Sequence, residues 1–87
     1  MKIWAQIHKG EKMITSYLYE VKEKFNIENF EQYLTEICEH LDMPRPITLR
    51  THLKHFSEFN NAVYKPIDFI ESVDFNRFVL EAVADDE

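Results

Sequence analysis

The chain has 87 residues and a mass of 10.5 kDa, which is enough for one small domain spanning residues 1–87. With one glycine and one cysteine, it cannot form a glycine-rich phosphate-binding loop, an internal disulfide or a cysteine-rich structural zinc site. The net charge of −6 argues against a protein whose main partner is nucleic acid or an anionic membrane surface. We therefore expect no cofactor and no nucleic-acid or membrane partner.

The first predicted element is a β-hairpin. Apolar and polar residues alternate through residues 2–21, with one polar break in the middle. A two-residue loop at Gly10 and Glu11 pairs Ile7 with Ile14 and keeps both isoleucines on one face. It also places the only glycine at the first central position of a type II′ turn, where φ must be positive.

An amphipathic helix is predicted over residues 30–41. Its apolar residues recur at helical spacing, as Phe30, Tyr33, Leu34, Ile37, Cys38 and Leu41. Asn26 or Asn29 can cap the start, and Pro44 is expected to end the helix because the residue before a proline disfavours helical geometry. Since Cys38 lies within the stripe and points away from His40, we expect a buried thiol rather than a nucleophile or a metal ligand.

A second, shorter helix is predicted over about residues 50–59. It follows a stiff proline connector and a β-prone run at residues 47–49. Leu49, Leu53, Phe56 and Phe59 fall near one face of this helix, which we expect to pack on the core.

The last part of the chain returns to extended structure. Residues 62–64 look extended, and residues 66–70 fit a single helical turn that begins near Pro66. Residues 78–83 read as a strand, bounded by the acidic residues 85–87 and expected to pair with the hairpin. Together these elements predict an α+β domain: an N-terminal hairpin and a C-terminal strand in a mainly antiparallel sheet, with one long and one short helix on one face.

His52 and His55 are the only residues whose spacing suggests a metal site. They lie three residues apart on the second helix, so two imidazoles could face one ion. A catalytic zinc needs a third protein ligand, which the sequence does not place nearby. We expect exposed histidines on a basic face and no bound metal, and we keep a metal-binding protein as the third functional hypothesis.

Charge falls into blocks of opposite sign. Residues 26–42 carry five acids and no base, including Glu31 and Glu39, whereas residues 43–57 carry Arg45, Arg50 and Lys54 and no acid. The acidic side of the first helix has two interpretations. It is either a solvated face partly neutralised by the chain's own basic residues, or a docking face for a basic partner.

Aromatic residues are abundant, with seven Phe, four Tyr and one Trp. Most are expected in the core, in particular Phe30, Phe56, Phe69 and Phe78. The hairpin register also places Trp4, Tyr17 and Tyr19 on one face, and such a cluster is typical of a protein contact surface.

Three segments together resemble a group of short, uncharacterised proteins from anaerobic Firmicutes. They are Met1–Ala5 (MKIWA) with the Lys-rich turn that follows, Leu41–Ile47 (LDMPRPI) and Asp68–Phe75 (DFIESVDF). The resemblance covers most of the chain and implies a bacterial cytoplasmic protein, but it brings no activity and no functional residues. The absence of a signal-peptide pattern and of a long apolar run agrees with a cytoplasmic location.

The sequence therefore predicts a non-enzymatic protein–protein interaction module. Its partner is another protein or a second copy, and self-association would use the face of Trp4, Tyr17 and Tyr19. The alternative is an acidic regulator or inhibitor that docks Glu31 and Glu39 on a basic site of a partner.

Overall fold

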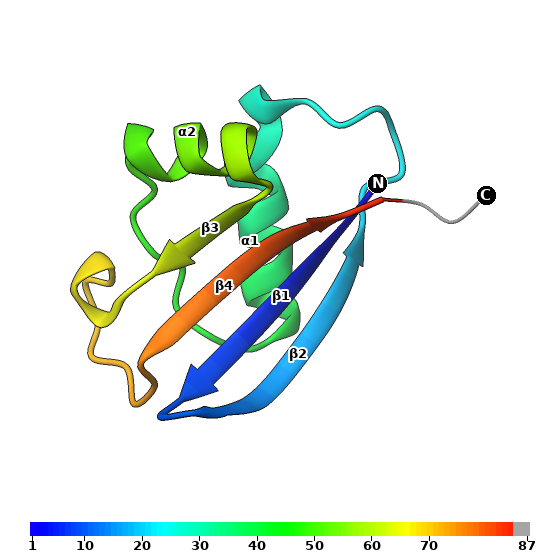
Figure 1. The fold of residues 1–87 in the computed structure, drawn as a ribbon. Helices are drawn as coiled ribbons and strands as arrows, with labels where there is room; N and C mark the ends of the chain where they lie inside the picture. The colour runs from blue at the N-terminus through cyan, green and yellow to red at the C-terminus, as the bar shows by residue number, and fades with distance from the viewer. Residues whose placement is uncertain (85–87) are drawn as a thin grey trace.

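The computed structural model describes residues 1–84. The acidic residues 85–87, which were expected to follow the last strand, lie outside this range. The elements of the described chain are β1 (Lys2–Lys9), β2 (Lys12–Glu20), η1 (Ile27–Asn29), α1 (Phe30–His40), α2 (Arg50–Phe59), β3 (Asn61–Tyr64), η2 (Pro66–Asp68) and β4 (Arg77–Val83), where η marks a short 3₁₀ turn. The strands form one antiparallel sheet in the order β2-β1-β4-β3. In the view of Figure 1, α1 passes behind this sheet and α2 lies above β3. The predicted α+β fold is confirmed.

The hairpin turn forms at Gly10 and Glu11, as predicted. φ is positive at Gly10, at 63°, and not at Glu11, as a type II′ turn requires. The backbone N–H of Gly10 donates to the side-chain oxygen of Asn76. The backbone N–H of Asn76 in turn donates to the carbonyl of His8 at 2.9 Å. The segment before β4 therefore holds the turn in place.

The register of the hairpin departs from the prediction after its first pairs. Met13 lies opposite His8, as the predicted loop requires, but Ile7 faces Thr15 instead of Ile14. Ile14 forms a β-bulge, which adds one residue to β2. Because side chains alternate between the two faces of a strand, this single residue moves every later side chain of β2 to the face opposite the predicted one.

The two remaining strands extend the sheet beyond β1. β4 pairs with β1, which confirms the predicted pairing of the C-terminal strand, and β3 pairs with the other side of β4. The prediction of a β-prone run at residues 47–49 is wrong, because these residues form no strand. Pro46 lacks an N–H and α2 begins at Arg50, so the run bonds to these neighbours instead of to a strand. The N–H of Ile47 donates to the carbonyl of Asp68 at 2.8 Å, and the carbonyl of Leu49 accepts the N–H groups of His52 and Leu53 in the first turn of α2.

The apolar stripe of α1 packs against the sheet as predicted. Its buried residues are Phe30, Tyr33, Leu34, Ile37 and Cys38. The side chain of Asn26 accepts the N–H of Glu28 at 3.0 Å and caps η1, the turn that leads into α1. Asn29 makes no capping bond through its side chain, so Asn26 is the cap that forms.

The C-terminal end of α1 differs from the prediction. The helix ends at His40, where Asp42 adopts a left-handed conformation with φ 52°. The N–H groups of Asp42 and Met43 donate back to carbonyls of the last turn at 3.2 and 3.0 Å, which is a Schellman arrangement. The helix is therefore closed by its own last turn before Pro44 is reached.

α2 has the predicted bounds, but its apolar face is only partly buried. Phe56 is buried and Leu53 packs against the edge of the core, whereas Leu49 and Phe59 are 52% and 60% exposed. Asn60 takes a left-handed φ of 63° and donates its N–H to the carbonyl of Phe56 at 2.9 Å. The chain thus reverses directly from α2 into β3.

The core lies between the two helices and one face of the sheet. All four phenylalanines that were predicted to be buried are buried: Phe30, Phe56, Phe69 and Phe78. The helical turn predicted at residues 66–70 forms as the shorter η2. None of the helices in residues 1–84 is long and apolar enough to cross a membrane.

Candidate interaction site

The outer edge of β2 is an open strand edge. The N–H of Val21 donates to the carbonyl of Met1 at 3.0 Å, which identifies a hydrogen-bonded pair of the β1–β2 ladder. Because such pairs alternate along an antiparallel ladder, the backbone groups of Ser16, Leu18 and Glu20 point away from β1. Within residues 1–84, no protein group bonds to these outward N–H and C=O groups.

This open edge also has the composition of a segment that pairs readily with another strand. β2 is nine residues long, and it carries no charge, proline or glycine from Met13 to Tyr19. Natural edge strands are usually short, charged or covered, because an unpaired edge is a template for another strand. The ends of β2 are protected by the charges of Lys12 and Glu20 and by the bulge at Ile14. The stretch between the bulge and Glu20 has no such protection.

The opposite edge of the sheet, formed by β3, is covered by side chains at both of its ends. The ladder with β4 turns the backbone groups of Asn61, Val63 and Lys65 outward. The Nδ1 atom of His55 donates to the carbonyl of Asn61 at 2.8 Å, and the carboxylate of Asp68 accepts the N–H of Lys65 at 2.8 Å. The fold therefore covers both ends of its four-residue edge and leaves the nine-residue edge of β2 without such cover.

A hollow of about 400 Å³ lies between β2 and α1, next to the open edge. The hydroxyl of Tyr19 donates to the carboxylate of Glu36 on α1, and the ring of Tyr17 stacks on His40 with centroids 3.7 Å apart. Partial burial and the hydrogen bond to Glu36 raise the pKa of Tyr19 above its ordinary value, so its hydroxyl stays a donor. Two half-buried tyrosine rings are thus fixed beside the edge.

The predicted contact face of Trp4, Tyr17 and Tyr19 does not exist as one surface. After the bulge, Tyr17 and Tyr19 share the helix-covered face of the sheet, while Trp4 lies on the other face opposite Leu18. The prediction is wrong because the bulge at Ile14 shifts the register by one residue. Tyr17 and Tyr19 nevertheless remain neighbours of the open edge.

The predicted acidic and basic residues are exposed, and two of them meet. Arg45 lies 3.7 Å from the carboxylate of Glu31 and donates to the hydroxyl of Thr35 at 2.7 Å. Glu39 is exposed on α1, and Arg50 is the exposed first residue of α2. The acidic face of α1 is therefore partly neutralised by the chain's own Arg45.

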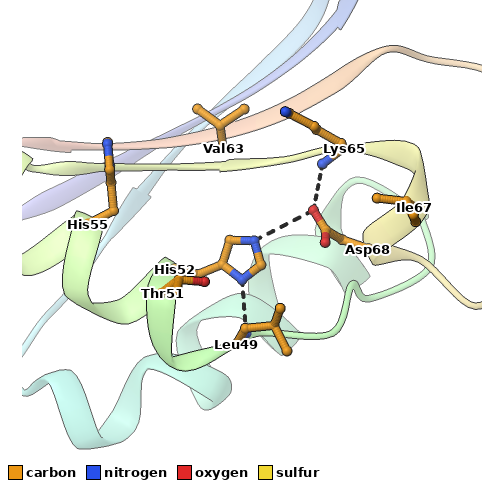
Figure 2. Close-up of a pocket in the computed structure, with 8 residues that line it drawn as sticks. All are labelled: Leu49, Thr51, His52, His55, Val63, Lys65, Ile67 and Asp68. Atoms are coloured by element: carbon orange, nitrogen blue, oxygen red, sulfur yellow. Dashed lines mark hydrogen bonds and ion pairs between the residues drawn. The ribbon is translucent and has the colours of Figure 1, made fainter.

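A second hollow, of about 340 Å³, lies between α2, β3 and η2 (Figure 2). Its centre is the ring of His52, which stacks on the buried Tyr64 with centroids 4.3 Å apart. The Nε2 atom of His52 lies 3.5 Å from the carboxylate of Asp68, and its Nδ1 atom accepts the N–H of Leu49 at 2.8 Å. These contacts tie the start of α2 to η2.

The pair of His52 and Asp68 links two elements of the fold. Because Nδ1 accepts a backbone N–H, the neutral ring carries its proton on Nε2 and directs it to Asp68. Both ring nitrogens therefore contact groups of the fold, Nδ1 as the acceptor of a backbone N–H and Nε2 beside the carboxylate of Asp68. The geometry identifies His52 as a structural link between α2 and η2.

His52 and His55 do not converge on one point. Figure 2 shows the two rings apart, with His52 directed to Asp68 and His55 directed toward β3. No group of three His, Cys, Asp or Glu side chains in residues 1–84 has an arrangement that could hold a metal ion. The described part of the chain therefore gives the metal-binding hypothesis no support.

Replacing Asp68 by alanine is expected to destabilise the protein by about 1 to 2 kcal/mol, because the N–H of Lys65 and the ring of His52 both lose their acceptor. Urea unfolding of the purified variant measures this loss. The matched control is Asp74→Ala, which removes an exposed aspartate from the loop before β4 and should change the free energy of unfolding by less than about 0.5 kcal/mol. Equal losses in the two variants would contradict the assigned role of Asp68.

Sequence reasoning missed the open edge, although part of its signal was present. The uncharged run from Met13 to Tyr19 is visible in the sequence, but whether a strand lies at the edge or in the centre depends on where β4 pairs. No protein-family model, curated protein or solved structure matches the chain, so its function must be inferred from its own geometry.

Proposed function

We propose that this protein is a non-enzymatic protein–protein interaction module that accepts an extended strand of a partner along the outer edge of β2. The observation that carries the proposal is the row of outward backbone groups at Ser16, Leu18 and Glu20, to which no group of residues 1–84 bonds. Addition of a strand satisfies such groups with main-chain hydrogen bonds, which supply affinity without a deep pocket.

The surroundings of this edge supply selectivity for side chains of the added strand. On one face of the sheet, alternate side chains of that strand would meet Tyr17, Tyr19 and the hollow beside α1. On the other face they would meet Leu18, which is 49% exposed. Apolar or aromatic side chains at alternate positions fit both faces best, since cross-strand neighbours of this kind stabilise a sheet.

The contacts of His52 and the burial of Cys38 support a non-enzymatic role. Both ring nitrogens of His52 are used by the fold, and burial raises the pKa of Cys38 to about 12, so its thiol stays protonated and weakly nucleophilic. The alternative of an acidic regulator has less support, because the carboxylate of Glu31 already lies beside the guanidinium of Arg45.

Peptide display against the immobilised protein tests the proposal. We expect enrichment of extended, β-prone peptides, and we expect Leu18→Pro to reduce their retention by about tenfold or more. Proline at this outward position removes an N–H that faces the partner and leaves the hydrogen bonds to β1 in place.

The matched control is Val63→Pro, which removes an outward N–H from the edge of β3 instead. It should retain the enriched peptides at the level of the unchanged protein. Circular dichroism of both variants checks that the fold persists. The proposal fails if no β-prone peptide is enriched, or if Leu18→Pro retains the enriched peptides as well as Val63→Pro does.

A further inference from the structure

We infer that the strand accepted by β2 is the β2 of a second copy of this chain, paired antiparallel about a two-fold axis at Leu18. The inference rests on the proposed function and names its partner. In this dimer two four-stranded sheets join into one continuous sheet, with the helices of both copies on the same side.

The hydrogen-bonding pattern of the edge is self-complementary about Leu18. A two-fold axis at this residue places Leu18 opposite its own copy, and Ser16 opposite Glu20 of the second copy. These three residues are the ones whose backbone groups point outward. Each such pair exchanges two bonds, so the three pairs form about six intermolecular hydrogen bonds.

The side chains agree with the same axis on both faces of the sheet. On the helix-covered face, Tyr17 of each copy lies opposite Tyr19 of the other, in the closely spaced pairs of the ladder. Both rings are half-buried and already held by contacts with α1, Tyr17 with His40 and Tyr19 with Glu36. Dimerisation therefore costs little side-chain conformational entropy at these two residues. On the face of the sheet that the helices do not cover, the two half-exposed Leu18 side chains meet at the axis.

Neighbouring registers satisfy fewer groups. An axis one residue earlier, at Tyr17, brings Glu20 opposite the bulged Ile14, where the strand is not regular. An axis one residue later, at Tyr19, places Leu18 opposite the charged Glu20 and pairs Ser16 with Lys22, which lies beyond the end of β2. The axis at Leu18 alone keeps every outward group within the regular part of the strand.

Charge substitutions at Ser16 test this register, because Ser16 faces Glu20 of the second copy twice in each dimer. Ser16→Lys is expected to tighten the dimer dissociation constant roughly two- to tenfold, and Ser16→Glu to weaken it by a similar factor, since like charges directly opposite repel. Sedimentation equilibrium over a concentration series measures both constants.

Leu18→Pro should give a monomer at concentrations where the unchanged protein is a dimer, and Val63→Pro should still dimerise. If Leu18→Pro does not fold, Leu18→Lys replaces it, because two lysines at the axis repel. A protein that stays monomeric at all concentrations overturns the inference, and if it still enriches β-prone peptides the proposed function survives. A dimer that is insensitive to the changes at Leu18, or that responds equally to Ser16→Lys and Ser16→Glu, also overturns it.

Discussion

Replacing Tyr64 by alanine is expected to reduce the free energy of unfolding by about 3 to 5 kcal/mol, as large-to-small changes of buried aromatic residues do. Tyr64 is fully buried. Its ring stacks on His52 and packs against Phe78 of β4 at a centroid distance of 5.9 Å, and its hydroxyl lies 2.9 Å from that of Thr48. The ring thus joins β3, β4, α2 and the connector that precedes α2. Because the free energy of unfolding of a small domain is only about 5 to 15 kcal/mol, this loss brings the protein near unfolding.

The matched control is Tyr64→Phe, which keeps the ring and removes only the hydrogen bond to Thr48. We expect it to cost about 0.5 to 1.5 kcal/mol. Urea unfolding followed by circular dichroism gives both values. A cost of less than about 1 kcal/mol for Tyr64→Ala, or equal costs for the two variants, would show that the ring does not join these elements.

Much of the fold could be predicted because its local signals agree with its packing. The stripe of α1 predicts which residues are buried, and Gly10 predicts the position of the hairpin turn. Such features depend on residues close together in the chain. Exposed residues at the ends of α2 are harder to predict, because the second helix covers the core only near Phe56.

The main failure came from a single extra residue in β2. The bulge at Ile14 leaves no clear mark in the sequence, since a regular hairpin and a bulged one keep the same turn and the same first two pairs, Lys9 with Lys12 and His8 with Met13. Its consequence is large, because Tyr17 and Tyr19 change faces relative to Trp4. The open face of the hairpin therefore carries Leu18 where the prediction placed tyrosines.

The candidate site could be predicted only in part for a different reason. The side chains that cover the ends of β3, His55 and Asp68, come from α2 and η2, and the packing of these two elements involves the contact of His52 with Asp68. Whether β2 is an edge depends on the pairing of β4 with the other side of β1. The uncharged stretch of β2 is visible in the sequence, but its position at the edge of the sheet follows only from the strand order.

Stability is expected to fall as the pH rises above about 9. Burial raises the pKa of Cys38 from 9.0 to about 12, and burial also raises the pKa of Tyr64 above its ordinary value. In the unfolded chain these groups release their protons at lower pH than in the folded chain. Between pH 9 and 12 the unfolded state therefore binds fewer protons, and the free energy of unfolding decreases with pH.

Cys38→Ala isolates the contribution of the thiol to this decline. The variant should be less stable than the unchanged protein at pH 7, because it leaves a small cavity, but its stability should fall less steeply between pH 9 and 10, where the unfolded thiol is the first of these groups to ionise. A series of urea unfolding curves from pH 7 to 11 measures both slopes. The difference in the free energy of unfolding between the two proteins should therefore narrow as the pH rises through the range in which the thiol titrates. Parallel curves would mean that the thiol of Cys38 ionises equally in the folded and unfolded chain, and that its place in the core does not protect its proton.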